Sequence, residues 1–532
     1  MKRKTIVTIA KVLTGIVLSA GVSYFINHLL QEHYRKITIS RDTTYVLGPV
    51  FSDGYVDYLS ALDSQFSQGV TPENNAAIPL FKAIGLKDTI RAVDRPRLLA
   101  ALHMPDVPDD TDTFTEYSAF CVNKAKAAAG RNSINNEGDV RELAWDQQAI
   151  CAKSPWTAAQ YPDVAQWLQK SAPALQLACD ASKCQFYYVP LIGRPGLGST
   201  LEVNIPSVGM LRELANALAA RSMLAIAHGD FAAWREDFLA QQRLGRLLMH
   251  TPTLIQSLVG IAIIDQAYQQ IPFALEHLSV DPSRQLLGDL RALDPTPDMV
   301  DCIDHCERLM PIGEITTLAR FGPVESLGSG SDPLPAPRWF GFQPPIHFDD
   351  LLRQYNELWD REVAALRVAK YSQRVLAISA VEADRKASLA ATTGSNSTAA
   401  IQRLILEMGN SFSSSRLLQD REHQNLRLTQ LTLLLHIYHL EHNSYPPTLA
   451  DLPDLRDSNL DLFADDAPIH YVPSADSCLI YSVGPNQRDD AGKRSEPKVA
   501  RSFNLLAPSI PPEFDDIAIR LPSSPASRPA AP

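Results

Sequence analysis

A stretch of apolar side chains near the N-terminus limits what this chain can become. Residues 6–30 are nearly all apolar or small, and Lys11 among them is long enough to reach lipid headgroups. A run of about 20 such residues crosses the hydrocarbon core of a bilayer. The basic leader MKRK precedes the run, and short basic segments stay in the cytoplasm. We therefore expect residues 1–36 to be a single-pass anchor in the inner (cytoplasmic) membrane, with the bulk of the chain extracytoplasmic.

Two other interpretations of this stretch stay open. A cleaved signal peptide would find small residues at Ser19, Ala20 and Gly21. The apolar run nevertheless continues to Leu30, as it does in a retained anchor. A helix in a protein core is the other alternative, although a terminal position behind a basic leader is unusual for one. The length of the run therefore favours the retained anchor.

Composition places the rest of the chain among ordinary globular proteins. The chain has 532 residues, of which 45% are hydrophobic and 20% are charged, so it is long enough for several domains with buried cores. Its formal net charge is −11. Because an acidic surface repels a phosphate backbone, we do not expect nucleic acid as a partner.

Helical periodicity dominates the middle of the chain. Between residues 207 and 274 apolar side chains recur every three or four positions, and Gly229-Asp230 and Thr251-Pro252 separate three helices. The third helix, TLIQSLVGIAIIDQAY, is apolar on nearly every side, which predicts the buried centre of a bundle. We therefore predict a mainly α fold, with an N-terminal transmembrane helix, a large helical bundle that has solenoid-like helix pairs, and a small C-terminal α+β module.

Changes in composition divide the chain into five segments. Short strands are expected at 186–189 and 200–203, inside an otherwise helical region. The segments are an N-terminal membrane anchor (1–36), a mixed helical region with short strands (43–206), a helical bundle interrupted by Pro, Gly and Ser loops (207–425), an α+β module (426–505) and a disordered Pro-rich tail (506–532).

The α+β module carries the most distinctive pattern. HIYHLEHNSYPPTLADL predicts a helix, a Tyr-Pro turn and a short helix, and a hairpin follows with strands at 469–472 and 478–483. This order resembles the C-terminal part of type II secretion major pseudopilins. No prepilin processing motif precedes the apolar run, so the resemblance does not extend to assembly into a pilus. The matching residues are Tyr445, Pro446, Leu449, Leu452, Tyr481, Ser482, Val483, Gly484 and Asp490.

A wider resemblance covers most of the chain. The phrases GVTPENNAAIPLFKAIG, AHGDFAAWREDFLAQQRLGRLLMHTPTLIQSLVGIAI and SVGPNQRDDAG occur in that order. Together they resemble a family of uncharacterised membrane-anchored proteins common in planctomycetes. The resemblance implies a helical, exported protein with a pseudopilin-like C-terminal module, and it implies no particular activity.

A calcium site is the best candidate for bound chemistry. Asn486, Asp489 and Asp490 lie in a Gly-Pro-Asn loop after a predicted strand, and carboxylate and amide oxygens are what Ca²⁺ prefers. Major pseudopilins bind calcium in this region, so the resemblance points the same way. An ordinary polar turn is the alternative, because Ca²⁺ takes about six to eight oxygens and the spacing is not that of an EF-hand.

The cysteines favour structural roles. Cys179 and Cys184 close a small loop in which a disulfide could form in an exported protein, although seven cysteines cannot all pair within one chain. Cys302, His305 and Cys306 bring thiols and an imidazole together, as a zinc site does. Their spacing is not that of a zinc knuckle, and packing on one helical face is the favoured interpretation.

Two further sets of side chains are candidates for sites. His436, His439 and His442 share one helix without a His-Glu-x-x-His motif, which favours a solvated helix face over a metal site. No nucleophile elbow or phosphate-binding loop is present in the sequence. Catalytic groups could still converge from distant segments, and the candidates for that are Glu73, Asn74, Asp237 and Glu307.

These patterns favour a function in binding and organisation over catalysis. We expect a membrane-tethered extracytoplasmic scaffold or an envelope or secretion assembly protein, with protein partners in the envelope. The alternative is an exported hydrolase with a scattered, metal-assisted site.

Overall fold

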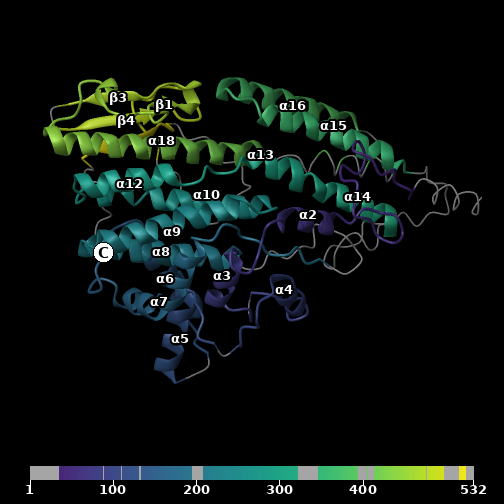
Figure 1. Cartoon of the computed structure of the whole chain (residues 1–532), viewed down its shortest axis with the longest axis horizontal. Helices are drawn as coiled ribbons and strands as arrows, with labels where there is room; N and C mark the ends of the chain where they lie inside the picture. The colour runs from purple at the N-terminus through teal and green to yellow at the C-terminus, as the bar shows by residue number, and fades with distance from the viewer. Residues whose placement is uncertain are drawn as a thin grey trace, which may run out of the picture.

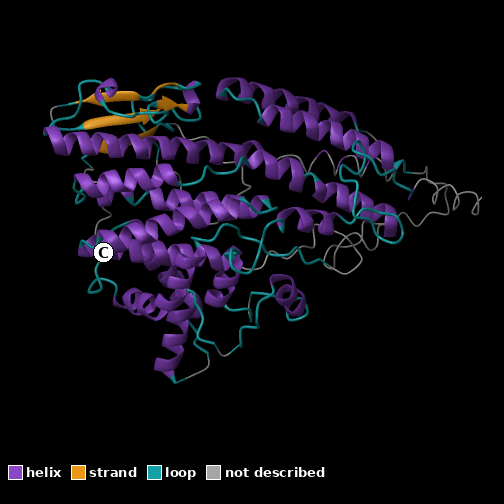
Figure 2. Ribbon diagram, in the orientation of Figure 1, coloured by secondary structure: helices purple, strands orange, loops and turns teal. Residues whose placement is uncertain are grey.

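The structure of the chain is a computed structural model, and it covers the predicted anchor only at Arg35 and Lys36. Among the described residues, no helix combines the length and apolar composition that crossing a bilayer requires. The described chain is mainly helical with a small sheet module near its C-terminus, as predicted (Figure 1 and Figure 2). The described residues are 35–87, 89–109, 111–130, 133–193, 208–321, 346–392, 399, 403, 406, 412–474, 476–495 and 514–522.

Mostly short helices make up the N-terminal third. They are α2 (Tyr58–Phe66), α3 (Ala77–Ile84), α4 (Arg95–Leu102), α5 (Tyr117–Ala129), α6 (Glu137–Lys153) and α7 (Pro162–Ala181). The prediction of a strand at 186–189 is wrong. Phe186 forms only an isolated parallel bridge with Asn75, and no strand continues from it in the described residues that follow. The Asn75 amide bonds both the N–H and the C=O of Tyr188, at 3.0 and 2.9 Å. A side chain thus occupies the edge where a partner strand would pair. The other strand, predicted at 200–203, lies outside the described residues.

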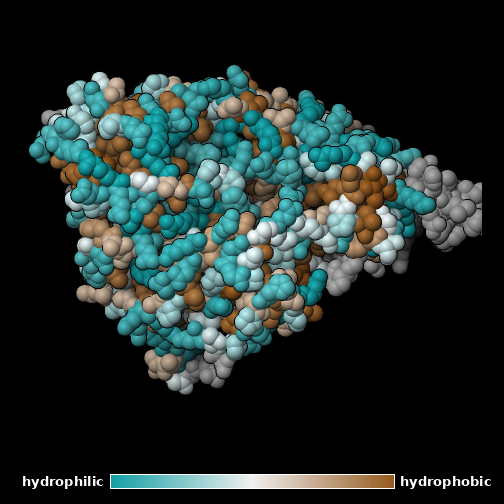
Figure 3. All heavy atoms as spheres, in the orientation of Figure 1, coloured by the Kyte–Doolittle hydropathy of each residue, from teal (hydrophilic) through white to brown (hydrophobic). Residues whose placement is uncertain are grey.

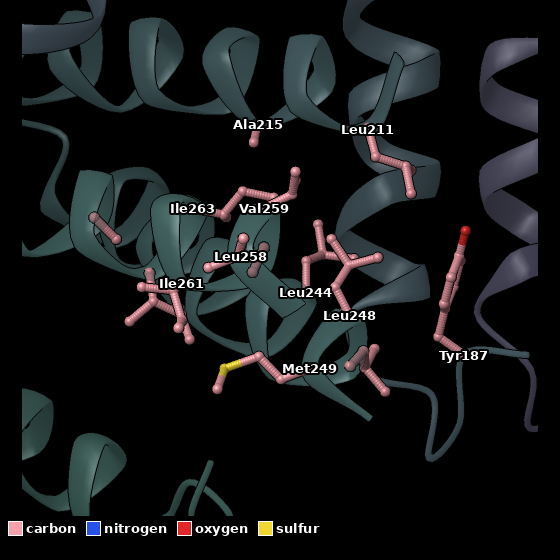
Figure 4. Packing of buried hydrophobic residues seen from close by; sticks show 14 of the residues in the cluster. Tyr187, Leu211, Ala215, Leu244, Leu248, Met249, Leu258, Val259, Ile261 and Ile263 are labelled. Carbon is pink, nitrogen blue, oxygen red and sulfur yellow. The ribbon is translucent and has the colours of Figure 1, made fainter. Parts of the chain in front are cut away.

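Three helices, α8 (Val208–His228), α9 (Phe231–Met249) and α10 (Leu254–Tyr268), form the centre of the bundle. Gly229, with φ +71°, ends α8, and the Asp230 carboxylate caps α9 by accepting the Ala233 N–H at 3.1 Å. The third helix begins later than Thr251-Pro252, because the Thr253 hydroxyl supplies the N-cap. Most of α10 is buried, as its apolar sequence predicted, although Ile255 is 55% exposed (Figure 4).

A close backbone contact joins α9 to α10. A Cβ added at Gly260 would lie 2.4 Å from the Gly245 carbonyl oxygen, and one added at Gly245 would lie 2.6 Å from the Gly260 oxygen. Real side-chain carbons do not approach a carbonyl that closely. The two glycines therefore set how near the two helices lie, and buried side chains such as Leu244, Leu248 and Leu258 fill the space beside them (Figure 4).

A second set of helices leads to the C-terminal module. One of them, α18, packs on α10 and α12 and carries strands β4 and β5 of the sheet (Figure 1). The set comprises α11 (Ile271–Leu275), α12 (Val280–Ala292), α13 (Met299–Cys302), the π-helical η1 (Ile303–Glu307), α14 (Leu309–Phe321), α15 (Phe348–Leu366), α16 (Tyr371–Ala391) and α18 (Phe412–His442).

The predicted hairpin is confirmed and belongs to a three-stranded antiparallel sheet in the order β3-β4-β5. His470 pairs with Tyr481 across β3 and β4, and Ile480 pairs with Ile519 across β4 and β5. A two-stranded ribbon of β1 and β2 lies beside it. The elements are the 3₁₀ turns η2 (Leu449–Asp451) and η3 (Leu462–Ala464), and the strands β1 (Leu460–Asp461), β2 (Ala467–Pro468), β3 (His470–Pro473), β4 (Cys478–Ser482) and β5 (Ile517–Leu521).

The third strand corrects the prediction of a disordered tail over 506–532. Within that range, the described residues 514–522 contain β5, which pairs with β4 along its whole length. The sequence IAIRL alternates apolar side chains with a small and a charged one, and Leu521 is buried against the sheet. Because prolines flank these five residues, the sequence favoured a disordered tail over a strand.

The boundary placed after residue 425 falls inside a continuous helix. Helix α18 begins at Phe412 and runs through that point without a break. Leu431 of α18 and Ile480 of β4 belong to the same buried cluster as Leu258 of α10. The sheet module and the bundle therefore share one hydrophobic core.

Candidate functional site

The loop after β4 is built around two fixed points. The Asp461 carboxylate, fully buried, accepts the Ser482 hydroxyl at 2.7 Å and the Val483 N–H at 2.8 Å. Gly484 follows with φ +66°, and a Cβ there would lie 2.3 Å from the Asp515 carbonyl oxygen. Only glycine fits this position, because both the backbone conformation and the close approach exclude a side chain. The loop is thereby held against the segment that begins β5.

The structure brings together two of the three predicted calcium ligands. Asn486 Nδ2 donates to Asp490 Oδ2 at 2.9 Å. Asp489 points elsewhere, because its Oδ1 accepts the Tyr481 hydroxyl at 3.1 Å and the Ala491 N–H at 2.9 Å. In this arrangement Asn486 presents its amide nitrogen, a donor, to Asp490. The predicted set of three oxygens therefore does not converge as it stands.

Two acids that the sequence analysis did not select lie beside Asp490. Asp516 Oδ2 accepts the Asp490 N–H at 3.1 Å and the Gly492 N–H at 2.8 Å. Its other oxygen, Oδ1, is buried and has no hydrogen-bond partner among the described residues. Asp515 Oδ1 accepts the Asn486 N–H at 3.4 Å, and its Oδ2 lies 4.0 Å from Arg421 of α18. We call Asn486, Asp490, Asp515 and Asp516 the acidic loop.

Charge in the acidic loop is only partly balanced. Burial raises the pKa of Asp516, and the nearby Asp490 carboxylate raises it further. Burial also raises the pKa of Asp515, and Asp490 acts in the same direction. By contrast, the Ala491 N–H lowers the pKa of Asp489, which stands apart from the group. A cation placed among Asp490, Asp515 and Asp516 would offset both burial and mutual repulsion.

The acidic loop is not a preformed metal centre. Among the residues that the structure describes, no group of three or more His, Cys, Asp or Glu side chains is positioned to hold a metal ion. The chemistry of the four side chains suits a hard cation such as Ca²⁺, which binds oxygen in flexible geometry.

A buried polar network lies under α18, close to the acidic loop. Glu422 is fully buried, and its two oxygens accept the hydroxyls of Tyr268 and Thr296, both at 3.4 Å. Burial raises the pKa of Glu422 to about 7. Asp265 of α10 accepts Asn425 Nδ2 at 3.1 Å, and burial raises its pKa to about 6. Two carboxyl groups near neutral pKa therefore lie in the same part of the bundle. The pattern of charges along the sequence gives no sign of this network.

The four scattered candidates for catalysis lie apart and have structural partners or solvent. Asp237 pairs with Arg221 at 2.6 Å, and Glu307 caps α10 by accepting the Leu254 N–H at 2.8 Å. Asn74 accepts the Thr71 N–H at 2.7 Å in the turn before α3, and Glu73 is exposed. The structure therefore does not assemble them into one site.

The cysteines are all free thiols in this structure. Cys179 donates to the Asp237 carboxylate at 3.7 Å, and no disulfide joins it to Cys184. Cys302 and Cys306 are buried, and the Cys302 thiol bonds the Pro252 carbonyl at 3.6 Å. This is the packing role that the spacing of the pair favoured.

The three histidines of α18 have separate surroundings. His436 is half-buried and bonds the Leu278 carbonyl oxygen at 3.0 Å. His439 is half-buried too and stacks on Tyr445, with ring centroids 4.4 Å apart. Only His442 is exposed, so the prediction of a solvated face is right for one of the three.

Comparison with known proteins adds no family. Neither a protein-family model, nor a curated protein sequence, nor a solved structure matches the chain.

Proposed function

We propose that this chain is a membrane-tethered extracytoplasmic scaffold whose C-terminal module is stabilised by a divalent cation. The observation that carries the proposal is the buried Oδ1 of Asp516, which lies beside Asp490 and Asp515 and has no hydrogen-bond partner among the described residues. A buried carboxylate oxygen without a partner is costly, and a cation is the partner that three neighbouring carboxylates would share. The N-terminal apolar run supplies the tether.

The position of the acidic loop gives a cation a structural effect. Asn486 and Asp490 follow β4, whereas Asp515 and Asp516 precede β5. An ion that bound both pairs would fasten β5, which is remote in sequence, to the centre of the sheet. Through Asp515 and Arg421 the same loop contacts α18, and α18 lies on the bundle. The proposed scaffold thus becomes rigid when the ion is bound, and protein partners in the envelope would meet one fixed surface.

The test is a melting curve of the detergent-solubilised full chain with and without millimolar CaCl₂. Binding to the folded state alone stabilises it by about 2.7 kcal/mol at 100 times the Kd, so Tm should rise with Ca²⁺ concentration. Mg²⁺ should do little, because it demands a tighter octahedral shell and keeps its water. An unchanged curve in Ca²⁺ would leave the loop as an ordinary polar turn.

A matched pair of variants locates the effect. Asp516→Asn keeps an acceptor for the two loop N–H groups but removes the charge, so it should abolish the Ca²⁺ shift. Asp489→Asn removes an equal charge from a carboxylate that faces Tyr481, so the shift should persist. A shift that is lost in Asp489→Asn but persists in Asp516→Asn would contradict the acidic loop and place the ion on Asn486, Asp489 and Asp490.

An exported hydrolase remains the second candidate function, and one observation favours it. The carboxyl groups of Glu422 and Asp265, with pKa values raised to about 7 and about 6, are suited to proton transfer near neutral pH. Asp265 is half-buried whereas Glu422 is fully buried, so Asp265 is the more accessible of the two carboxyl groups. Hydrolysis of chromogenic esters or phosphate esters by the full chain, lost in Asp265→Asn, would support this function. Equal rates in both proteins would contradict it.

A further inference from the structure

The point where the described chain begins is fixed to a small hairpin. The Tyr55 hydroxyl donates to the Arg35 carbonyl oxygen at 3.1 Å. Val50 and Val56 pair as an antiparallel bridge, and the Phe51 N–H bonds the Tyr55 carbonyl at 2.7 Å. The chain that arrives from the apolar run therefore meets the body of the protein at this hairpin.

The end of α14 lies against the same hairpin. The Arg320 guanidinium carbon lies 4.1 Å from the centre of the Phe51 ring and 4.6 Å from that of Phe321. The Arg320 guanidinium also forms an ion pair with the Asp53 carboxylate at 2.5 Å, and this pair balances the negative charge of the hairpin. Two segments far apart in sequence thus form one surface around Arg320.

Large apolar side chains are exposed on this surface and next to it. Leu47 is 64% exposed, Val50 is 49% exposed and Phe321 is 37% exposed. Figure 3 shows hydrophobic atoms gathered at the end of the molecule where Figure 1 places α14. We call Leu47, Val50, Phe51, Tyr55 and Phe321 the exit surface.

We propose that the exit surface rests on the lipid bilayer beside the N-terminal span. This inference depends on the membrane tether of the proposed function. From Leu30, where the apolar run ends, to Arg35 there are five residues, which reach at most about 18 Å when fully extended. The exit surface therefore lies within reach of the headgroup region that the span leaves.

The chemistry of the exit surface suits that region. Aromatic rings with a polar group, such as the half-buried Tyr55, are favoured where hydrocarbon meets water. Arg320 is paired with Asp53 and its side chain is only 11% exposed, so its role is to hold Phe51 and Phe321 together. Leu47 and Val50 would bury apolar area that the folded protein leaves in water. A bilayer is present wherever the span is inserted, so no additional partner is required.

Brominated lipids test the contact directly. The full chain is reconstituted into phosphatidylcholine vesicles with and without bromine on the acyl chains, and Trp fluorescence is compared for Val50→Trp and the parent. The emission that the new Trp adds to the six native ones should fall at least twofold in brominated vesicles. Leu47→Trp should behave in the same way. The control is Leu376→Trp on α16, at a site 71% exposed, whose added emission should not change.

Vesicle flotation separates failure of this inference from failure of the tether. If the Val50→Trp and Leu47→Trp chains float with the vesicles but their added emission is not quenched, the lipid contact is overturned and the tether stands. If the added tryptophans are also shielded from iodide in water, another protein segment covers the exit surface and the lipid contact is equally wrong. Chains that do not float would contradict the tether, and the lipid contact with it.

Discussion

We expect the buried carboxyl group of Glu422 to make the free energy of unfolding depend on pH. Burial raises the pKa of Glu422 to about 7, whereas an unfolded chain leaves a glutamate at about 4.3. Between these values the folded state keeps a proton that the unfolded state has lost. Stability supported by this group is therefore complete below about pH 4 and is lost as the pH rises toward 7.

We predict that Glu422→Gln weakens the dependence of the free energy of unfolding on pH between about pH 4.5 and 7. The amide carries no titrating proton, so the variant should gain stability relative to the parent as the pH rises from 4.5 to 7, by on the order of 3 kcal/mol. Melting curves at half-unit intervals of pH measure the difference. Glu142→Gln, at an exposed position of α6, is the control and should run parallel to the parent. A Glu422→Gln profile that also ran parallel would contradict the assignment.

Only part of the acidic loop could be predicted from the sequence. Asn486 and Asp490 were predictable because they follow a strand and a Gly-Pro turn, which are local signals. Asp515 and Asp516 were not, because their importance comes from pairing between β4 and β5, whose partners are about 40 positions apart. Glu422 reads as one charge among several on a long helix, and only packing under α18 makes it a buried acid.

At the scale of elements, the contact between α9 and α10 depends on two glycines. Both Gly245 and Gly260 lie in the middle of helices, where glycine costs about 1 kcal/mol relative to alanine. Their helices approach so closely that each backbone occupies the place of the other's side chain. The gain from packing the apolar faces of the two helices outweighs that intrinsic cost.

We predict that Gly260→Ala lowers the stability of the bundle by about 2 kcal/mol or more, as overpacking a rigid contact does. The new methyl group would meet the Gly245 carbonyl, which is backbone and cannot rotate away. Gly288→Ala in α12 is the matched control, because nothing lies within 4 Å of the added carbon. It should leave stability unchanged or raise it by about 0.5–1 kcal/mol. Equal Tm values for the two variants would show that α9 and α10 separate without cost.

Elements were predictable to the extent that their signal is local. The helices through 211–218 and 231–248 repeat apolar residues at helical spacing and end at recognisable caps, and both are confirmed. The hairpin of β3 and β4 is confirmed for the same reason, since its strands are close in sequence. Strand β5 was missed because five residues of alternation inside a Pro-rich stretch are a weak signal. Its stability comes from β4.

At the scale of the whole molecule, the basic leader and the apolar run predict one orientation in the membrane. The described chain begins at Arg35, whose carbonyl oxygen accepts the Tyr55 hydroxyl of the exit surface. We predict that the C-terminal module lies outside the cytoplasm, because the four basic residues at the start of the run outnumber the three that follow it. These are Lys2, Arg3, Lys4 and Lys11 before, and Arg35, Lys36 and Arg41 after.

Reporter fusions to the C-terminus of the full chain measure that orientation. Alkaline phosphatase, which is active only after export, should be active, and a fluorescent protein that matures in the cytoplasm should be dark.

Replacing Lys2, Arg3 and Lys4 with Glu removes most of the positive charge that retains the leader, so phosphatase activity should fall severalfold. Replacing Lys82, Lys87 and Lys124 with Glu changes the same total charge within the folded body and should leave activity unaltered, because orientation depends on charge next to the span. A bright fluorescent fusion beside an inactive phosphatase would place the module in the cytoplasm. Because the cytoplasm holds far less free Ca²⁺ than the extracytoplasmic space, that result would also argue against Ca²⁺ binding by the acidic loop.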